Sequence, residues 1–379
     1  MDFELSEEQQ LLKDMAGRFM QDRYGFETRN KYMKEPLGFD PAIWEAYAEQ
    51  GLLALPFAEE DGGIGGGGVE VMIVMEEMGR ALSLEPYLAT AVIGASILRN
   101  GATEAQRKAL AEEIIGGACK LAFAHSEAAA RYDLAHVGTK AEKSGEGYTL
   151  SGAKTLVLWG GAADKLIVSA RVSGGLRDED GVALFLVDPS ASGVSLQVYD
   201  TQDGLKAAEV TLEGAAGELL GDAPGQGMAV IRQAADEAIA ALCAEAVGAM
   251  EKALNLTVDY IKQREQFGRA IGSFQGLQFQ ASDMFVELEL AKSMAMYASM
   301  CARDPDPVER SRACSAAKAQ VGRSLKALGE RSIQLHGGVG MTMEYSIGHY
   351  FKRLSIIDRM FGDVDFHLQK LDEAGGLAA

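Results

Sequence analysis

The first 118 residues have the apolar spacing of helices. Ser6, followed by two glutamates and Gln9, has the form of a helix N-cap with acids in the first turn. Apolar side chains then recur three and four positions apart, at Leu11, Leu12, Met15, Phe19 and Met20. Similar patterns predict further helices over residues 41–50, 69–82 and 104–115.

The middle of the chain changes to short runs rich in β-branched and other apolar residues. Clusters of Gly, Asp, Ser and Pro separate these runs, and such residues favour turns. The runs cover residues 148–152, 165–171, 182–188, 194–198 and 208–212. Their length and spacing predict a compact antiparallel β-domain.

From about Gly227 the helical pattern returns and continues to the end of the chain. Long helices are predicted over residues 227–265, 275–303 and 307–335, which is typical of a helix bundle. The order of helices, strands and helices predicts an α+β protein with three domains. Their expected bounds are 1–118 for an N-terminal helical domain, 119–226 for the β-domain and 227–379 for the C-terminal helical domain.

The charge of the chain excludes two classes of partner. Its 379 residues include 36 Lys and Arg against 55 Asp and Glu, a formal net charge of −19. Binding to nucleic acid requires a basic surface, and so does attachment to an anionic membrane. We therefore expect neither partner, and any anion that the protein holds must bind at a local site.

The cysteines and the N-terminus indicate a reducing compartment. The four cysteines are scattered and form no C-x-x-C pair, so neither a disulfide framework nor a metal site is predicted. The N-terminus lacks the basic and apolar regions of a secretory signal. No apolar run is long enough for a transmembrane helix. These features favour a cytoplasmic protein.

Two glycine-rich segments are candidates for phosphate binding. Residues 63–68 satisfy the pattern G-x-G-x-x-G, but a helical segment precedes them where a dinucleotide site requires a strand. A flexible loop between helices is the better interpretation there. Residues 334–340 read Gln-Leu-His-Gly-Gly-Val-Gly after a long predicted helix. Their backbone N–H groups suit a phosphate, and a turn between two helices fits the same residues equally well.

Three motifs in order resemble the acyl-CoA dehydrogenase family over essentially the whole chain. Leu150-Ser-Gly-Ala-Lys154, followed by Gly160-Gly-Ala-Ala-Asp164, is similar to the family's L-N-G-x-K…A-D hairpin. Residues 260–275 match its Y-x-x-x-R-x-x-F-G…Q pattern, and residues 334–340 match its Q-x-x-G-G-x-G segment. The resemblance implies an N-terminal helical domain, a central β-domain and a C-terminal four-helix domain.

The same resemblance implies a flavoprotein that dehydrogenates acyl-CoA thioesters and uses FAD. Family members are commonly tetramers in which the C-terminal domain of one subunit holds the ADP half of its neighbour's FAD. Transferred by position, the residues that hold the neighbour's FAD are Arg264, Phe267, Gln275, Gln334, Leu335, His336, Gly337 and Gly338. For Arg264 the alternative is a surface ion pair. The usual electron acceptor is an electron-transfer flavoprotein.

The catalytic base of the family is missing from both of its usual positions. Aligned by the motifs, these positions hold Gly362 near the C-terminus and Ala238 on the first long C-terminal helix. Ile239 stands where an Arg usually follows. Asp363 and Glu237 are each one residue away and are weak candidates for a displaced base. Their alternative interpretations are an Asp that stabilises a turn and a solvent-exposed acid on a helix.

The β-domain departs from the family at the residues that would contact this chain's own flavin. The family's T-E-P-x-A-G-S-D loop becomes residues 126–133, where Arg131 and Tyr132 replace small residues. The W-I-T segment becomes Leu156-Val-Leu158, and Leu158 cannot donate the hydrogen bond that a hydroxyl gives to flavin N5.

These losses lie on the side of the chain's own flavin, whereas the residues that reach a neighbour's FAD are kept. They suggest the partner subunit of a heteromeric acyl-CoA dehydrogenase acting in fatty-acid or steroid side-chain β-oxidation. Three alternatives stay open: a homotetramer with a displaced base, a different flavin chemistry on the same scaffold such as that of an oxidase or monooxygenase, and a non-catalytic subunit that binds CoA thioesters.

Overall fold

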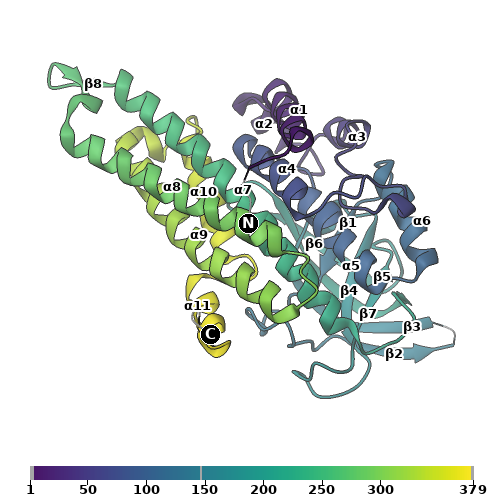
Figure 1. Ribbon diagram of the computed structural model, residues 1–379. Coiled ribbons are helices and arrows are strands. Elements are labelled where there is room, and N and C mark those ends of the chain that lie inside the picture. The colour runs from purple at the N-terminus through teal and green to yellow at the C-terminus, as the bar shows by residue number, and fades with distance from the viewer. Residues whose placement is uncertain (1–3, 146, 377–379) are drawn as a thin grey trace. The chain divides into compact units, whose positions relative to one another are not determined.

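The computed structural model describes residues 4–145 and 147–376. The chain divides into two compact units, which are labelled in Figure 1 by their elements. The helical unit comprises Met1–Asn30, Gly68–Ser83 and Ile239–Ala379, and the sheet unit comprises Lys31–Gly67 and Leu84–Ala238. The segment expected to form an N-terminal helical domain is thus divided between the two units.

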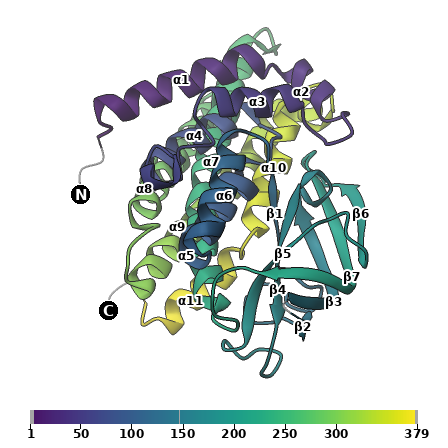
Figure 2. The same cartoon turned by 90° about the vertical axis from the view of Figure 1, so that its right-hand side faces the viewer.

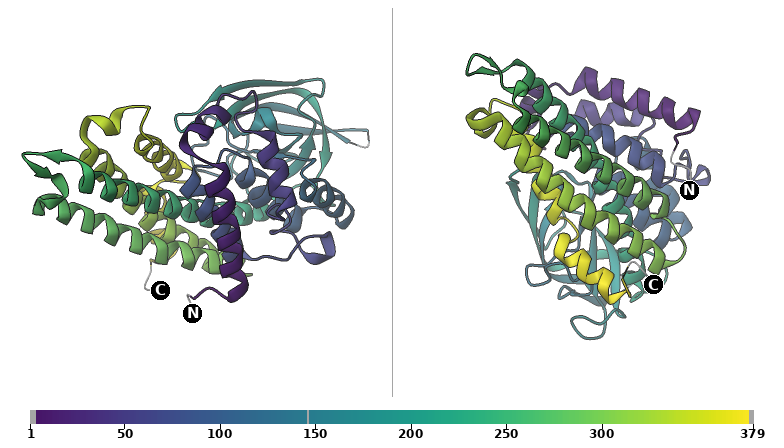
Figure 3. Two further views of the ribbon diagram at one scale, coloured as in Figure 1. Left: turned by 90° about the horizontal axis from the view of Figure 1, so that it is seen from above. Right: turned by 60° about the vertical axis from the view of Figure 1, so that its left-hand side comes forward.

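The helical unit is built from long helices, as the sequence predicts. Helix α8 packs lengthwise against α9, and Figure 3 shows these green helices from two sides. The long helices are α7 (Gly227–Gln263), of which the part from Ile239 onward belongs to this unit, α8 (Gln275–Cys301) and α9 (Pro307–His336). Shorter helices complete it: α1 (Glu7–Arg23), α2 (Phe26–Tyr32), of which the part up to Asn30 belongs to this unit, α4 (Gly68–Ala81), α10 (Ile347–Arg359) and α11 (Val364–Glu373).

Helix starts follow the capping residues in the sequence. Ser6 accepts a hydrogen bond from the backbone N–H of Gln9, whose side chain bonds back to Ser6, so the predicted N-cap of α1 is confirmed. Asp306 caps α9 and is followed by a proline at the first helical position. Both arrangements satisfy N–H groups that a helix start leaves without an internal partner.

Helices α4 and α7 of the helical unit touch through their backbones. A β-carbon built on Gly79 would overlap the carbonyl oxygen of Glu245, and one on Gly248 would overlap that of Glu76. Only glycine permits so close an approach. Beside this crossing Arg80 forms ion pairs with Glu77 and Glu251, so one guanidinium compensates part of the charge of two carboxylates.

The sheet unit contains a seven-stranded sheet in the order β1-β4-β2-β3-β7-β5, with β6 beside β7 (Figure 2). Strand β5 also pairs with β4, so the pairing returns toward the start of the sheet as in a barrel. The strands are β1 (Leu121–Ala124), β2 (Lys140–Ser144), β3 (Gly147–Leu158), β4 (Lys165–Arg171), β5 (Val182–Val187), β6 (Val194–Asp200) and β7 (Lys206–Leu219).

The prediction of an antiparallel sheet is only partly right. Strand β4 pairs in parallel with β1 and with the end of β2, whereas the other pairs in this sheet are antiparallel. Strand β1 was not predicted, because its four residues show no alternation. A buried cluster that includes Leu150, Val168 and Phe185 forms the core of this sheet.

Short helices accompany the sheet, and two of them match the predicted ranges closely. These are α3 (Pro41–Glu49) and α6 (Glu104–Ile115), to which the structure adds α5 (Ala95–Gly101) and a π-helical segment (Leu88–Gly94). Within residues 4–145 and 147–376, none of the helices combines the length and apolar character that a membrane span requires.

The glycine-rich segment 63–68 packs tightly and offers no phosphate site. The N–H groups of Gly63, Gly65 and Gly66 donate to the carbonyls of Ala58, Phe57 and Leu55 at 2.9, 2.7 and 2.8 Å. These N–H groups are therefore occupied. A β-carbon on Gly63 would overlap the Phe57 carbonyl, so the glycine is required for packing.

Enlarging either glycine at the α4–α7 crossing should destabilise the protein. We expect Gly79→Ala or Gly248→Ala to lower the free energy of unfolding by at least about 2 kcal/mol, because the added methyl group forces two backbones apart. Urea unfolding measures this change. Gly276→Ala is the control, since a β-carbon there meets no atom within 4 Å and alanine favours a helix. Equal stability of all three variants would contradict the close contact.

Candidate functional site

Three of the predicted cofactor-binding residues lie exposed just beyond the C-terminal end of α7. Helix α7 ends at Gln263, and a short hairpin of β8 (Glu265–Gln266) and β9 (Arg269–Ala270) follows. Arg264 immediately precedes this hairpin, Phe267 lies at its tip, and Gln275 begins α8. The Phe267 side chain is 91% exposed, with its ring edge-on to Phe274. A side chain this apolar and this exposed is available to contact a flat ligand.

The predicted glycine loop is open on its outer side. Gly337, with a φ of 59°, ends α9, and it and Gly338 are exposed. A β-carbon on either glycine would meet no atom of the chain within 4 Å, so a ligand can approach this backbone closely. The side chains of Leu335 and His336 are buried. These two residues can therefore contact a cofactor only through their backbone.

An aromatic cluster brings the end of α7 next to the glycine loop. The ring of His336 stacks on that of Tyr260, with centroids 4.5 Å apart, and lies 5.1 Å from that of Tyr345. His336 Nδ1 donates to the Ser332 carbonyl at 2.7 Å, and burial lowers the pKa of this histidine. Because Tyr260 is one turn before Arg264, the cluster places this arginine on the same side of the bundle as Gly337.

This donor set fits the pyrophosphate and adenine of an FAD. A guanidinium binds phosphate oxygens through paired hydrogen bonds, exposed glycine backbone allows close approach, and an aromatic ring offers a flat apolar surface. Among the described residues, no group of His, Cys, Asp and Glu side chains has the arrangement of a metal site.

The first usual base position, Gly362, has no room for a side chain. It lies between α10 and α11 with a φ of 115°. A β-carbon there would overlap the ring of Phe366 and lie 2.7 Å from Nε2 of His367. The Gly362 carbonyl accepts a hydrogen bond from the buried ammonium of Lys318 at 2.8 Å, which fixes the turn. A carboxylate at this position would require the local structure to rearrange.

Asp363, one of the two weak candidates, is the N-cap of α11. Its Oδ1 accepts the backbone N–H of Phe366 at 3.0 Å. This contact matches the alternative interpretation of an Asp that stabilises a turn.

Glu237, the other weak candidate, is buried in an ion pair of the sheet unit. Both of its oxygens lie 2.6 Å from Nη2 of Arg99, and Ser96 donates to it at 2.7 Å. The expectation of a solvent-exposed acid on a helix is therefore wrong, because α5 supplies a cation and a hydroxyl that compensate for burial. Ala238, the second usual base position, is completely buried.

The segments of the sheet unit that correspond to the family's flavin loops keep an unusual backbone. Arg131 and Leu156 have φ angles of 51° and 52°, although neither is glycine. Such angles are costly for residues with a β-carbon and occur most often at functional sites. Leu156 is 51% exposed, and Trp159 points inward, where its Nε1 donates to the Leu84 carbonyl at 2.7 Å. The side chains presented outward are thus Leu156 and Arg131.

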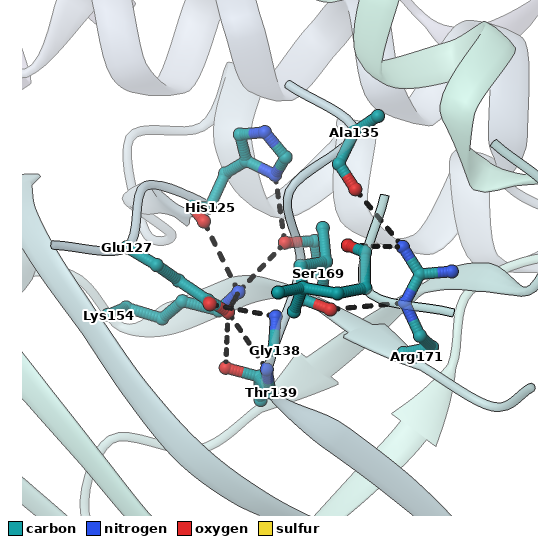
Figure 4. Close-up of polar contacts among 10 residues, drawn as sticks. His125, Glu127, Ala135, Gly138, Thr139, Lys154, Ser169 and Arg171 are labelled. Atoms are coloured by element: carbon teal, nitrogen blue, oxygen red, sulfur yellow. Dashed lines mark hydrogen bonds and ion pairs between the residues drawn. The ribbon is translucent and has the colours of Figure 1, made fainter. Parts of the chain in front are cut away.

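A buried ion pair beneath these segments holds them in place (Figure 4). Glu127 accepts hydrogen bonds from Lys154 Nζ at 2.8 Å and from the N–H groups of Gly138 and Thr139 at 2.7 and 2.9 Å. Burial would raise the pKa of Glu127, but the Lys154 ammonium and the N–H donors lower it to about 2. For Lys154 burial prevails over the neighbouring carboxylate and lowers the pKa to about 8.

Two further residues complete this network. Nδ1 of His125 lies 2.8 Å from the Ser169 hydroxyl, which also accepts from Lys154 at 3.1 Å. The Ser169 hydroxyl therefore bridges the His125 ring and the Lys154 ammonium. Arg171 donates to six backbone carbonyls in residues 135–180, including that of Ala135 at 3.0 Å. The motifs drew attention to Glu127 and Lys154, but nothing in the sequence identified His125, Ser169 or Arg171.

Comparison with known proteins finds three domain descriptions along the chain. "Acyl-CoA dehydrogenase, N-terminal domain" matches residues 6–118, the "middle domain" matches 122–214 and the "C-terminal domain" matches 225–374.

Individual proteins resemble the chain over nearly its full length. The probable acyl-CoA dehydrogenase YngJ of Bacillus subtilis is 29% identical and covers 98% of both chains. The acyl-CoA dehydrogenase IpdE2 of Mycobacterium tuberculosis is 30% identical over 92% of this chain and 91% of its own. Among solved structures, a variant of the steroid ACAD Tcur3481-Tcur3483 is 29% identical with a TM-score of 0.87, and 97% of each chain is covered.

Two buried histidines should make the protein less stable in mild acid. Burial lowers the pKa of His125 and of His367 from 6.5 to about 3. Below pH 6.5 the unfolded chain binds protons that the folded chain does not. The contribution of these neutral histidines to the free energy of unfolding is therefore fully present above pH 6.5 and is lost as the pH falls toward 3. At pH 5 each of these histidines should lower the free energy of unfolding by about 2 kcal/mol.

Urea unfolding at pH 7.5 and pH 5, with the His125→Gln variant as comparison, measures this contribution. The variant should lose less stability than the unmodified protein between the two pH values. An identical loss in both proteins would show that His125 is not neutral in the folded state.

Proposed function

Because the chain belongs to the acyl-CoA dehydrogenase family of FAD-dependent oxidoreductases acting on CH–CH bonds, we propose that it is the partner subunit of a heteromeric enzyme. In this role it holds the ADP half of an FAD whose flavin end and catalytic base belong to a second, homologous chain. The observation that carries the proposal is Gly362, which has no carboxylate and no space for one.

In this role the chain's own residues bind and orient the ADP half of the FAD. Arg264 binds the pyrophosphate, Phe267 covers the adenine-ribose portion, and Gln275 supplies a hydrogen bond beside them. The backbone of Gln334–Gly338 approaches the phosphates, and the open space over its glycines supports this role. Bound FAD supplies the hydride acceptor for the α,β-dehydrogenation of an acyl-CoA thioester. Removal of the α-proton falls to the partner subunit.

The segments of the sheet unit that would face the flavin also support a role in which the second chain supplies the flavin end of the site. The family's small and hydroxyl-bearing residues are replaced by Arg131 and Leu158, and the Leu158 side chain offers no donor to flavin N5. The solved steroid relative bears the double designation Tcur3481-Tcur3483, which agrees with two unlike chains and with a bulky acyl group. We propose a heterotetramer in the cytoplasm with an electron-transfer flavoprotein as the electron acceptor.

Co-expression with a homologous chain that retains its base should be required for activity. We expect the lone chain to purify without flavin absorbance, because half of the FAD site is missing. The complex should be yellow and should oxidise acyl-CoA thioesters. If the lone chain binds FAD and turns over acyl-CoA, the partner-subunit role is wrong.

A matched pair of variants locates the FAD contact in the complex. Arg264→Gln should lower retention of FAD on gel filtration by at least about tenfold, the size of one lost charge-assisted contact. Lys262→Gln removes a neighbouring exposed charge at the end of α7 and should retain FAD. Equal retention of FAD by both variants would show that Arg264 does not bind the cofactor.

The complex should keep its turnover when Asp363 is changed to Asn. Asparagine caps a helix as well as aspartate does, so α11 should remain intact while the carboxylate is lost. The rate of acyl-CoA oxidation, measured with an artificial electron acceptor, should stay within about twofold of the unmodified complex, since a factor of two is only about 0.4 kcal/mol in the barrier. Loss of turnover would instead make Asp363 the base and favour the homotetramer with a displaced base.

A further inference from the structure

A cavity of about 640 Å³ in the helical unit is lined by an unusual number of cations. Helices α1, α2, α4, α7 and α10 form its walls. Its basic residues are Lys13, Arg18, Arg29, Arg80 and Lys252, against two acids, Asp14 and Glu77. In a protein with a net charge of −19, this excess of positive charge is local and points to an anionic occupant.

Internal partners neutralise only some of these cations. Arg80 is paired with Glu77 and Glu251, and Lys13 lies 3.8 Å from Glu76. Arg18 and Lys252, by contrast, form no ion pair with any residue that the structure describes. The only hydrogen bond of the Arg18 guanidinium to the described residues runs from Nε to the Asp14 carbonyl, which leaves its terminal nitrogens for a ligand.

Arg29 gives the cavity a buried and oriented guanidinium. Only 2% of its surface is exposed, and its Nε donates to the Leu82 carbonyl at 2.8 Å. Its Nη1 lies 3.5 Å from Nδ1 of His349, whose Nε2 lies 3.2 Å from the Met343 carbonyl and donates to it. A guanidinium N–H can only donate, so Nδ1 of His349 is the acceptor, and burial lowers the pKa of this histidine. Arg29 is therefore held rigidly at the cavity wall.

Much of the remaining wall is apolar, although Gln21 and Ser346 also line it. Met20, Phe26, Leu82 and Leu256 line the cavity together with the Tyr350 ring, whose hydroxyl is occupied by a hydrogen bond to the Arg80 carbonyl at 2.6 Å. A purely inorganic anion would leave this apolar surface in contact with water. An anion with a hydrocarbon body would cover it and place its charged end among the arginines.

We propose that this cavity binds a small amphipathic organic anion, a carboxylate with an apolar chain or ring, through Arg18 and Lys252, and that Arg29 adds a fixed positive charge to the wall. A guanidinium pairs with a carboxylate through two parallel hydrogen bonds, and the volume suits a ligand of this size. None of the residues expected to hold FAD lines the cavity. The inference is therefore independent of the proposed subunit role.

Isothermal titration of the full chain with octanoate tests the proposal. We expect saturable binding of one octanoate per chain, and at least about tenfold weaker binding in the double variant Arg18→Gln/Lys252→Gln, because two charge-assisted contacts are lost. The control Arg23→Gln/Lys262→Gln makes the same charge change on exposed positions of α1 and α7 that do not line the cavity. This control should bind octanoate like the unmodified chain.

Two further probes complete the test: octan-1-ol, which is uncharged, and pyrophosphate, which has no apolar part. Octan-1-ol should bind at least about tenfold more weakly than octanoate, because it lacks the charge. Pyrophosphate should also bind more weakly, because it lacks the apolar body. Equal binding of octan-1-ol, tighter binding of pyrophosphate, or unchanged octanoate binding in the Arg18→Gln/Lys252→Gln variant would overturn the proposal. So would the absence of octanoate binding.

Discussion

The backbone contact between α4 and α7 at Gly79 and Gly248 is the constraint on which the helical unit depends. Two helices at this distance leave no room for side chains between them, so Glu77, Arg80 and Glu251 must satisfy one another beside the crossing. The Arg80 carbonyl then accepts the Tyr350 hydroxyl, which anchors α10 to the same point. Because only residues 342–346 separate the glycine loop from α10, the crossing indirectly restricts the exposed backbone that we assign to the cofactor.

The residues that match the family pattern differ in exposure between the two halves of the expected flavin site. On the helical unit the retained groups are exposed and need an outside ligand, as with Phe267 and the glycine loop. On the sheet unit the retained groups are internal, and the Glu127–Lys154 pair still holds a strained backbone whose outward side chains have changed. Preserving a scaffold while replacing the surface it presents is consistent with a chain that cooperates with a second subunit.

Much of the fold could be predicted from local sequence signals. Most of the contacts that restrict the candidate site could not. Caps and periodicity located α1, α4, α6 and the three long helices, because those signals are contained within a few turns of chain. The parallel pairing of β1 with β4 and the burial of Glu237 depend on residues far away in sequence, namely β4 and Arg99. The missing base was visible at Gly362, but the overlap with Phe366 that closes this position needs coordinates. The cavity beside Arg29 likewise has no linear motif, since five separate helices supply its wall.

The turn at Gly362 also has an evolutionary consequence. A single codon change could restore a glutamate there, yet the new side chain would collide with Phe366 and His367 and would disturb a carbonyl that Lys318 holds. At least one further substitution would have to come first, and by itself that substitution would open a cavity in a packed region without any gain. In the subunit role proposed above, a return to catalysis by this chain alone therefore needs at least two substitutions rather than one.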